Sequence, residues 1–286
     1  MIAFAEDKFL CMKVDAEKGE GMDLAERYHI TGYPTIIFTR AAGGEVDRII
    51  GYLPPDRFLE ELDRITSGKN TLESIRAEIE HDPQDLDAFL RYGWKLDDRE
   101  VYSEAIDVWR SVQLLSKDNS PASRLGDFKV AEALALADSI TDPLDAYLEA
   151  VPESEYTAQA MQGVVQIYRS RHDVLAEATG YKQLVDYSIQ IKAATPRLLN
   201  SYAWRMTQLE ENLEDALERV RLGVELAAGD EAESRAGILD TEAEVLWKLG
   251  RVDEALEVIT VCIKLQPEDN YYRDQKAKFE ASRPPA

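Results

Sequence analysis

The chain has 286 residues, of which 45% are hydrophobic, and its 55 acidic and 33 basic side chains give a net charge of −22. Such a surface repels nucleic acid, whose phosphates are bound mainly through Lys and Arg, so we exclude DNA and RNA as partners. No run approaches the roughly 18 apolar residues that a membrane span needs, and the two distant cysteines argue against a disulfide-stapled domain.

The first part of the chain is predicted to alternate strands and helices. Its apolar runs are short and are separated by glycine-containing turns, which is typical of strands. The predicted elements are, in chain order, a strand Phe9–Asp15, a helix Gly21–Tyr28, a turn Gly32-Tyr33-Pro34-Thr35, a strand Ile36–Phe38, a Gly43-Gly44 turn, a strand ending at Gly51-Tyr52 and a helix from about Pro55 to Ile65.

From about Asn70 onward the apolar residues follow a helical period. Asn70-Thr71 is a helix-capping sequence, and the helix that follows is predicted to end near His81-Asp82-Pro83. We interpret this helix as the connector between two domains, residues 1–68 and 70–280. The acidity belongs mainly to the second, because residues 1–70 hold only 13 of the 55 acidic side chains.

The second domain repeats a pattern of two amphipathic helices with small residues at fixed places. These small residues are Gly93 and Ala105, Ala203 and Ala216, and Ala243 and Ala255. Antiparallel helices approach closely only where small side chains meet, and one such pair cannot bury its apolar face alone, so neighbouring pairs must stack. Residues 121–196, interrupted by Pro121, Pro152 and Pro196, are interpreted as two degenerate pairs, which gives five pairs in all.

Two resemblances follow from these patterns. The order of elements in Phe9–Leu62, with Gly32-Tyr33-Pro34-Thr35 leading into an apolar strand, resembles the C-terminal half of thioredoxin and its disulfide-exchange relatives. Residues Leu239–Pro267 resemble a tetratricopeptide repeat. The expected fold is therefore an α-rich α/β segment, a partial thioredoxin-like domain, followed by an all-α tetratricopeptide-like solenoid.

The reactive motif of the thioredoxin family is missing from this sequence. Disulfide exchange needs an activated thiolate and a resolving thiol within one Cys-x-x-Cys turn, whereas Cys11 and Cys262 lie most of the chain apart. Two interpretations remain open. The sequence is either an N-terminally clipped copy of a longer redox protein, which would be bacterial and extracytoplasmic, or a remnant that keeps the peptide-docking side without the chemistry, soluble and cytoplasmic as given.

Candidate binding residues come partly from the resemblance. In the thioredoxin family the proline of this turn is cis, and the residue before it pairs with the substrate backbone, which implies roles for Tyr33 and Pro34. In the repeat geometry Trp94 and Trp204 occupy matching places, either on a concave binding face or in the core. The residues expected to face the same groove are Asn200, Asp240 and Glu244.

The expected ligand is a basic or apolar peptide or protein, because two of these groove positions are acidic. No catalytic residue, metal site or cofactor is predicted, since His29, His81 and His172 are far apart and lack metal-ligand spacing. Protein binding or scaffolding is therefore the expected function. The alternative is the C-terminal portion of a thiol–disulfide oxidoreductase whose Cys-x-x-Cys lies upstream of this chain.

The resemblance also predicts local structure. We expect a cis Tyr33–Pro34 bond. In the family another strand lies between the counterparts of Phe9–Val14 and Thr35–Phe38, so its removal leaves two sticky edges. We expect these two strands to pair with each other, or a second copy to supply a strand in a homodimer.

Overall fold

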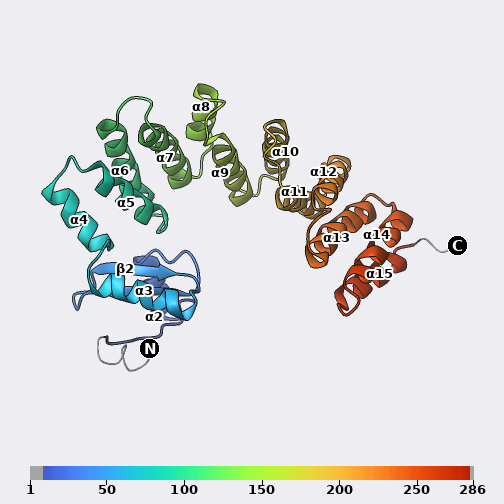
Figure 1. The fold of residues 1–286 in the computed structure, drawn as a ribbon, viewed down its shortest axis with the longest axis horizontal. Coiled ribbons are helices and arrows are strands. Elements are labelled where there is room, and N and C mark those ends of the chain that lie inside the picture. Colours follow the sequence, from blue (N-terminus) through green and yellow to red (C-terminus); the bar gives the residue numbers. More distant parts are fainter. Residues whose placement is uncertain (1–8, 284–286) are drawn as a thin grey trace. The chain divides into compact units, whose positions relative to one another are not determined.

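The computed structural model describes residues 9–283 and divides into two compact units between Pro143 and Leu144. The first unit holds two strands and the helices up to α7, and the second begins within α8 (Figure 1). The strands are β1 (Thr35–Thr39) and β2 (Glu45–Ile50). The helices of the first unit are α2 (Glu20–Arg27), α3 (Pro55–Thr66), α4 (Leu72–His81), α5 (Leu86–Asp97), α6 (Tyr102–Leu115) and α7 (Pro121–Asp138).

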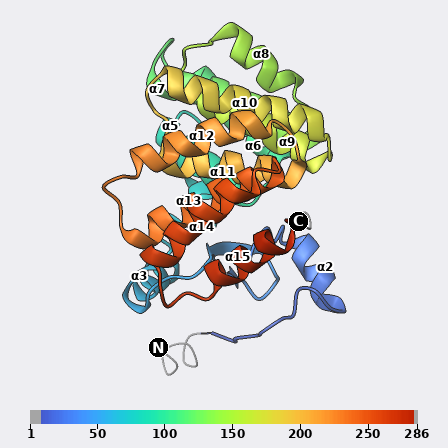
Figure 2. The ribbon, with the colours of Figure 1, turned by 90° about the vertical axis from the view of Figure 1, so that its right-hand side faces the viewer.

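The second unit is entirely helical among its described residues. Its helices are α8 (Asp142–Ala150), α9 (Thr157–Ser170), α10 (Val174–Gln190), α11 (Pro196–Leu209), α12 (Leu213–Leu226), α13 (Ala232–Lys248), α14 (Val252–Leu265) and α15 (Tyr271–Ala281). Neighbours pack as α9 with α10, α11 with α12 and α13 with α14, and α15 packs on α14 at the C-terminal end (Figure 2). In the first unit α5 packs with α6 and α6 with α7, so the α-rich fold class is confirmed.

The small residues lie at the helix crossings, as predicted. Ala105, Ala203, Ala216, Ala243 and Ala255 are all fully buried. A Cβ on Gly93 would come within 2.6 Å of the Trp109 ring, so only glycine lets α5 and α6 approach this closely. The antiparallel pairs with small residues at their crossings are a tetratricopeptide-like array.

Local sequence signals fix the helix ends. Thr71 accepts a hydrogen bond from the backbone N–H of Ser74, whose hydroxyl in turn accepts one from the Thr71 N–H. This reciprocal capping box starts α4 where the sequence predicted it. Pro121 and Pro196 occupy the first turns of α7 and α11, where a missing N–H costs nothing. Gly250 has φ +77° in the turn between α13 and α14, a conformation that favours glycine.

The sheet contains only two strands among the described residues. β1 and β2 pair antiparallel from Thr35↔Ile50 to Thr39↔Glu45, with an irregularity between Phe38 and Thr39. The side chains of Val46, Ile49 and Ile65 form a small core between the sheet and α3. The Tyr33–Pro34 bond is cis, which confirms that prediction.

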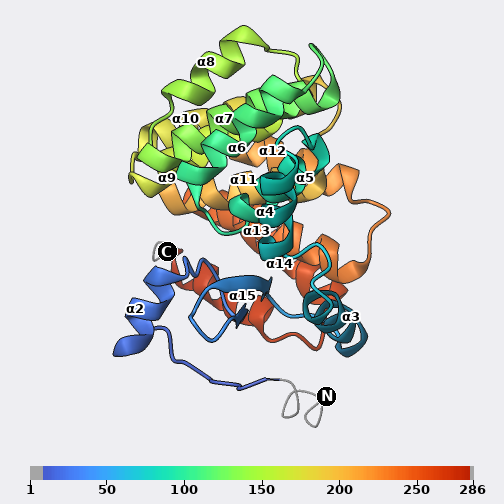
Figure 3. The same ribbon diagram turned by 90° about the vertical axis from the view of Figure 1, so that its left-hand side faces the viewer.

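The predicted strand Phe9–Asp15 is wrong. Figure 3 shows this segment as an irregular trace that leads into α2, and it has no regular secondary structure. The expected pairing of Phe9–Val14 with the Thr35 strand is wrong as well, because β1 pairs only with β2 in the part of the chain described. A strand has no hydrogen bonds of its own and forms only beside a partner. The expected homodimer remains a prediction.

Candidate polypeptide-docking site

The turn before β1 is held from both sides. The Thr35 hydroxyl donates to the Gly32 carbonyl at 2.7 Å, and the Gly51 N–H donates to the Pro34 carbonyl at 2.8 Å. These bonds fix the backbone of the turn against the end of β2. The Tyr33 side chain remains 62% exposed, so the turn presents an aromatic ring to solvent from a rigid backbone.

Beside this turn, the outer edge of β1 has no strand partner among residues 9–283. No backbone hydrogen bond within that range uses this edge, and an unpaired strand edge is where a peptide can add a strand to a sheet. Ile36, on β1, is about two-fifths exposed. The turn and the edge together form what we call the docking edge: Tyr33, Pro34 and Thr35–Thr39.

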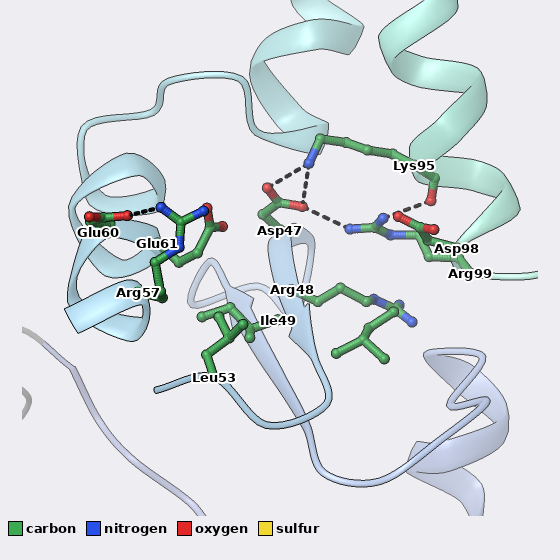
Figure 4. A pocket seen from close by; sticks show the side chains of 11 residues that line it. Asp47, Arg48, Ile49, Leu53, Arg57, Glu60, Glu61, Lys95, Asp98 and Arg99 are labelled. Atoms are coloured by element: carbon green, nitrogen blue, oxygen red, sulfur yellow. Dashed lines mark hydrogen bonds and ion pairs between the residues drawn. The ribbon is translucent and has the colours of Figure 1, made fainter. Parts of the chain in front are cut away.

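Behind the docking edge, β2 is fastened to the helices by buried charges. The Asp47 carboxylate is fully buried and meets three cations: Arg64 of α3 at 2.8 Å, and Lys95 of α5 and Arg99 just after it, each at 2.9 Å. Figure 4 shows Lys95 and Arg99 reaching Asp47 from the helical side. Since α5 belongs to the first helix pair, these contacts join the sheet to the array.

A second carboxylate extends this network. Glu45 accepts from Arg99 at 2.8 Å and from Arg48 at 2.6 Å. Arg48 also donates to the carbonyls of Tyr28 and His29, so it ties the end of α2 to β2. We call this group the β2 ion cluster; its members are Glu45, Asp47, Arg48, Arg64, Lys95 and Arg99.

The β2 ion cluster requires ionised carboxylates. Burial alone would raise the pKa of Asp47, but hydrogen bonds and charge from Lys95 and Arg64 outweigh it and hold that pKa below its usual value. The pKa of Glu45 is also lowered, because Arg48 and Arg99 overcome the effect of burial. Both side chains are therefore charged at neutral pH.

A pocket of about 490 Å³ lies between β2, α3 and the end of α5 (Figure 4). Its charged lining residues are balanced in sign: Arg48, Arg57, Lys95 and Arg99 against Asp47, Glu60, Glu61 and Asp98. The buried cations Arg48, Lys95 and Arg99 already make ion pairs with Asp47 or Glu45. We interpret the pocket as the joint between sheet and array.

Trp94, predicted as a groove residue, lies on α5 and is 46% exposed. Its ring packs edge-on against the buried Trp109 ring, with centroids 5.5 Å apart. The Lys129 ammonium lies 4.6 Å from the Trp94 ring centroid. Trp94 is thus partly buried and partly exposed. A role in the core and a role on a binding face therefore both remain predictions.

The other predicted groove residues belong to the second unit. Trp204 of α11 is 38% exposed, and Asn200, one turn earlier, has a buried side-chain oxygen with no hydrogen-bond partner among the described residues. Asp240 and Glu244 lie on α13 and are buried. The Tyr271 hydroxyl donates to Asp240 at 3.0 Å, and Lys278 pairs with Glu244 at 2.7 Å, so side chains of α15 occupy both carboxylates.

Burial raises the pKa of Asp240 to about 6, and the nearby charge of Glu244 adds to the shift, while Tyr271 and Lys278 oppose it. Burial likewise raises the pKa of the Cys262 thiol to about 12, with a contribution from Asp240. Cys262 is therefore a protonated, buried thiol of the second unit, whereas Cys11 is exposed in the first. Residues 9–283 contain no group of three or more His, Cys, Asp or Glu placed to hold a metal ion.

Sequence reasoning missed the β2 ion cluster. A signal for it exists, because Asp47 and Arg48 are adjacent charges within the strand Glu45–Ile50, and adjacent residues of a strand point to opposite faces. At least one of the two charges must then be buried in a covered sheet, and a buried charge requires a partner. Arg48 pairs with the nearby Glu45, but Lys95 and Arg99, the partners of Asp47, are some 50 positions away, which the sequence alone does not reveal.

Comparisons with known proteins agree with the first part of this description. A family model described as a thioredoxin-like domain matches residues 4–66. A search of curated proteins gives no match. In the part of the chain described, no helix is both long enough and apolar enough to cross a membrane.

Similar solved structures are repeat proteins. A Podosopora anserina protein with nearly identical TPR-like repeats is 14% identical, with a TM-score of 0.46, over 64% of this chain and 96% of that one. YrrB, a TPR protein with an unusual peptide-binding site, is 13% identical, with a TM-score of 0.45, over 72% and 99%. A TPR repeats protein from Bacteroides fragilis is 14% identical, with a TM-score of 0.29, over 81% and 100%.

Proposed function

We propose that this protein binds other polypeptides and that the docking edge receives an extended segment of the partner. The observation that carries the proposal is the outer edge of β1, which has no strand partner among residues 9–283, beside the exposed Tyr33 ring. Main-chain pairing along such an edge supplies affinity with little dependence on sequence, and side-chain contacts add preference. The resemblance to thioredoxin supports this role, because the family's substrate backbone pairs at the position that Tyr33 occupies here.

The β2 ion cluster gives the docking edge a fixed platform. Asp47 and Glu45 connect β2 to α3 and, through Arg99 and Lys95, to the first helix pair. A partner bound along β1 would therefore be held at a defined place relative to α5.

The preferred partner is basic or apolar. With a net charge of −22 the protein attracts cations and repels acidic chains at low ionic strength. The exposed side chains Tyr33 and Ile36 of the docking edge are aromatic and aliphatic. An extended segment with aliphatic residues flanked by Lys or Arg combines both preferences.

Photo-crosslinking tests the proposed docking edge directly. The probe is reduced, carbamidomethylated ribonuclease A, a basic polypeptide that cannot refold. A benzophenone amino acid in place of Tyr33 is expected to crosslink to it, and the same replacement at Leu114, an exposed aliphatic position on α6, serves as the control. Equal crosslinking at the two positions, or crosslinking at Leu114 alone, would contradict the proposal.

A second candidate function is that of a thiol–disulfide oxidoreductase whose Cys-x-x-Cys lies upstream of Met1. The observation that favours it is the apolar segment Leu10–Val14, which has the pattern of a strand but no strand partner among the described residues. Sequencing the transcript upstream of the Met1 codon distinguishes the two. An in-frame Trp-Cys-x-x-Cys supports the oxidoreductase, and a stop codon without an intervening start supports binding alone.

A further inference from the structure

The pocket between β2, α3 and the end of α5 is lined by cations that are themselves buried. Its volume of about 490 Å³ lies within the range of about 300–1,000 Å³ that is typical of small-molecule sites. The side chains of Arg48 and Arg99 are 3% and 4% exposed, and that of Lys95 is 16% exposed. Figure 4 shows Lys95 and Arg99 coming from the helical side, and Ile49 and Leu53 from the side of the sheet. Three cations with little access to solvent therefore line one cavity.

These three cations carry more N–H groups than their neighbours accept. A guanidinium has five N–H groups and an ammonium has three. Arg48 makes four hydrogen bonds, two of them to Glu45, and Arg99 also makes four. Lys95 makes two, both to the Asp47 carboxylate. Within the range 9–283, each of the three cations thus keeps one N–H without an acceptor.

The two carboxylates of the β2 ion cluster have no matching surplus of acceptors. Asp47 accepts four hydrogen bonds, from Arg64, Lys95 and Arg99. Glu45 also accepts four, all from guanidinium groups. A carboxylate offers about four lone-pair sites, so both groups are fully used. A further partner of the cluster must therefore be an acceptor.

The charges of these groups are unequal as well. The β2 ion cluster holds four cations and two carboxylates. Arg64 has a third carboxylate, Glu61, at 2.9 Å, which leaves one positive charge without a paired carboxylate. Burial lowers the pKa of Lys95, and repulsion from Arg64 and Arg99 adds to this, so that the contacts with Asp47 do not restore it. One negative charge beside Lys95 would relieve this repulsion.

We propose that this pocket binds a small organic monocarboxylate. The ligand carboxylate accepts from the unused N–H groups of the three buried cations, and an aliphatic body lies against the apolar lining residues Ile49, Ile50 and Leu53. A carboxylate has only acceptors and carries one charge, so it matches both the surplus donors and the surplus charge. A phosphate group carries about −1.5 to −2 charges at pH 7 and has no apolar part, so it matches less well.

The net charge of −22 does not prevent such binding. At physiological salt, interactions between exposed charges are screened beyond about 8 Å, so the buried cations decide the potential inside the pocket. The pocket borders β2, whereas the docking edge is the outer edge of β1. The carboxylate site is therefore separate from the proposed function and does not rest on it.

An NMR titration of the full chain tests this inference. The probes are hexanoate and hexanamide, which has nearly the same shape but no charge. We expect hexanoate to bind saturably, at least about tenfold more tightly than hexanamide, and to shift the backbone amides of residues 47–50 and 95–99. Equal affinity for the two probes, no saturable binding, or shifts confined to other residues would overturn the inference. Tighter binding of inorganic phosphate than of hexanoate would overturn the assignment to a carboxylate.

Variants with opposite expected effects complete the test. Lys95→Gln should weaken hexanoate binding at least about tenfold, and Lys117→Gln, at an exposed lysine after α6, is the matched control that should not. Asp98 is an exposed lining carboxylate without an ion pair in the described part of the chain. Asp98→Asn should therefore strengthen hexanoate binding about threefold, a gain that a folding defect cannot imitate. Unchanged or weaker binding by Asp98→Asn, or equal binding by the two lysine variants, would contradict the carboxylate site.

Discussion

At the residue scale, the first unit depends on one buried carboxylate. Asp47 pairs with Arg64, Lys95 and Arg99, which come from α3, from α5 and from the residues just after α5. Removing one partner of a buried ion pair is far more costly than its net contribution, because the remaining charges stay buried without compensation. Asp47 is therefore the residue whose loss should separate the sheet from the helices.

Replacing Asp47 with Ala should destabilise the first unit by about 3–5 kcal/mol, the range for breaking a buried pair. Glu60→Ala is the matched control, because Glu60 pairs with Arg57 at the surface, where such pairs are worth about 0–1 kcal/mol. Urea denaturation of both variants measures the difference. Similar urea midpoints for the two variants would show that the β2 ion cluster does not hold the unit together.

Asp240 gives the second unit a pH dependence of opposite sign from that of Asp47. Its folded pKa, about 6, lies above the usual aspartate value of 3.8, so the folded state binds the proton more tightly. The protonated Asp240 therefore contributes to the stability of the folded state. That contribution is full below pH 3.8, is lost as the pH rises through about 6, and is absent above that pH. Asp47, with its lowered pKa, stabilises above pH 3.8 and loses that effect as the pH falls.

Asp240→Asn should therefore stabilise the second unit at pH 7.5. A two-unit pKa shift corresponds to about 3 kcal/mol, which is an upper value because asparagine changes the bond to Tyr271. The measurement is the unfolding free energy of variant minus wild type at pH 4.5 and 7.5. We expect this difference to grow with pH; a constant or shrinking difference would contradict the role of Asp240.

At the element scale, the helices could be predicted and one strand could not. A helix such as α4 carries its own hydrogen bonds, and its cap at Thr71 is visible in the sequence. The strand predicted for Phe9–Asp15 depends on a neighbour that the pattern cannot supply. The docking turn at Tyr33 was recognised from its motif, whereas the β2 ion cluster was missed because Asp47 and Lys95 meet only in the folded unit.

The α5–α6 crossing offers a test of the packing. In Gly93→Ala the new Cβ would lie 2.6 Å from the rigid Trp109 ring, so the helices must move apart. Overpacking of this kind costs about 1–3 kcal/mol. Gly237→Ala in α13 is the control, since it meets nothing within 4 Å and should gain about 1 kcal/mol of helix propensity. Thermal unfolding followed by circular dichroism measures the midpoints. We expect a midpoint below that of the wild type for Gly93→Ala but not for Gly237→Ala.

At the scale of the whole molecule, the first unit combines a two-stranded sheet with helices, the second unit contains helices among its described residues, and the sequence has no dithiol motif. Cys262 is buried with a raised pKa, and Cys11 has no vicinal thiol. We therefore expect the purified chain to reduce an insulin disulfide no faster than a small thiol does. Turnover that survives Cys11→Ser with Cys262→Ser would refute the thiol argument, and turnover lost with Cys11→Ser alone would reveal a one-thiol mechanism.

The central claim is that the docking edge binds extended polypeptide without using a thiol. The measurement that tests it most directly is the affinity of the Cys11→Ser, Cys262→Ser double variant for carbamidomethylated ribonuclease A, with amide exchange followed at Tyr33 and Thr35–Thr39. We predict that the double variant binds with the same affinity as the wild type and that binding slows amide hydrogen exchange in β1. Weaker binding by the double variant than by the wild type would contradict the claim. Binding that leaves amide exchange in β1 unchanged would contradict it as well.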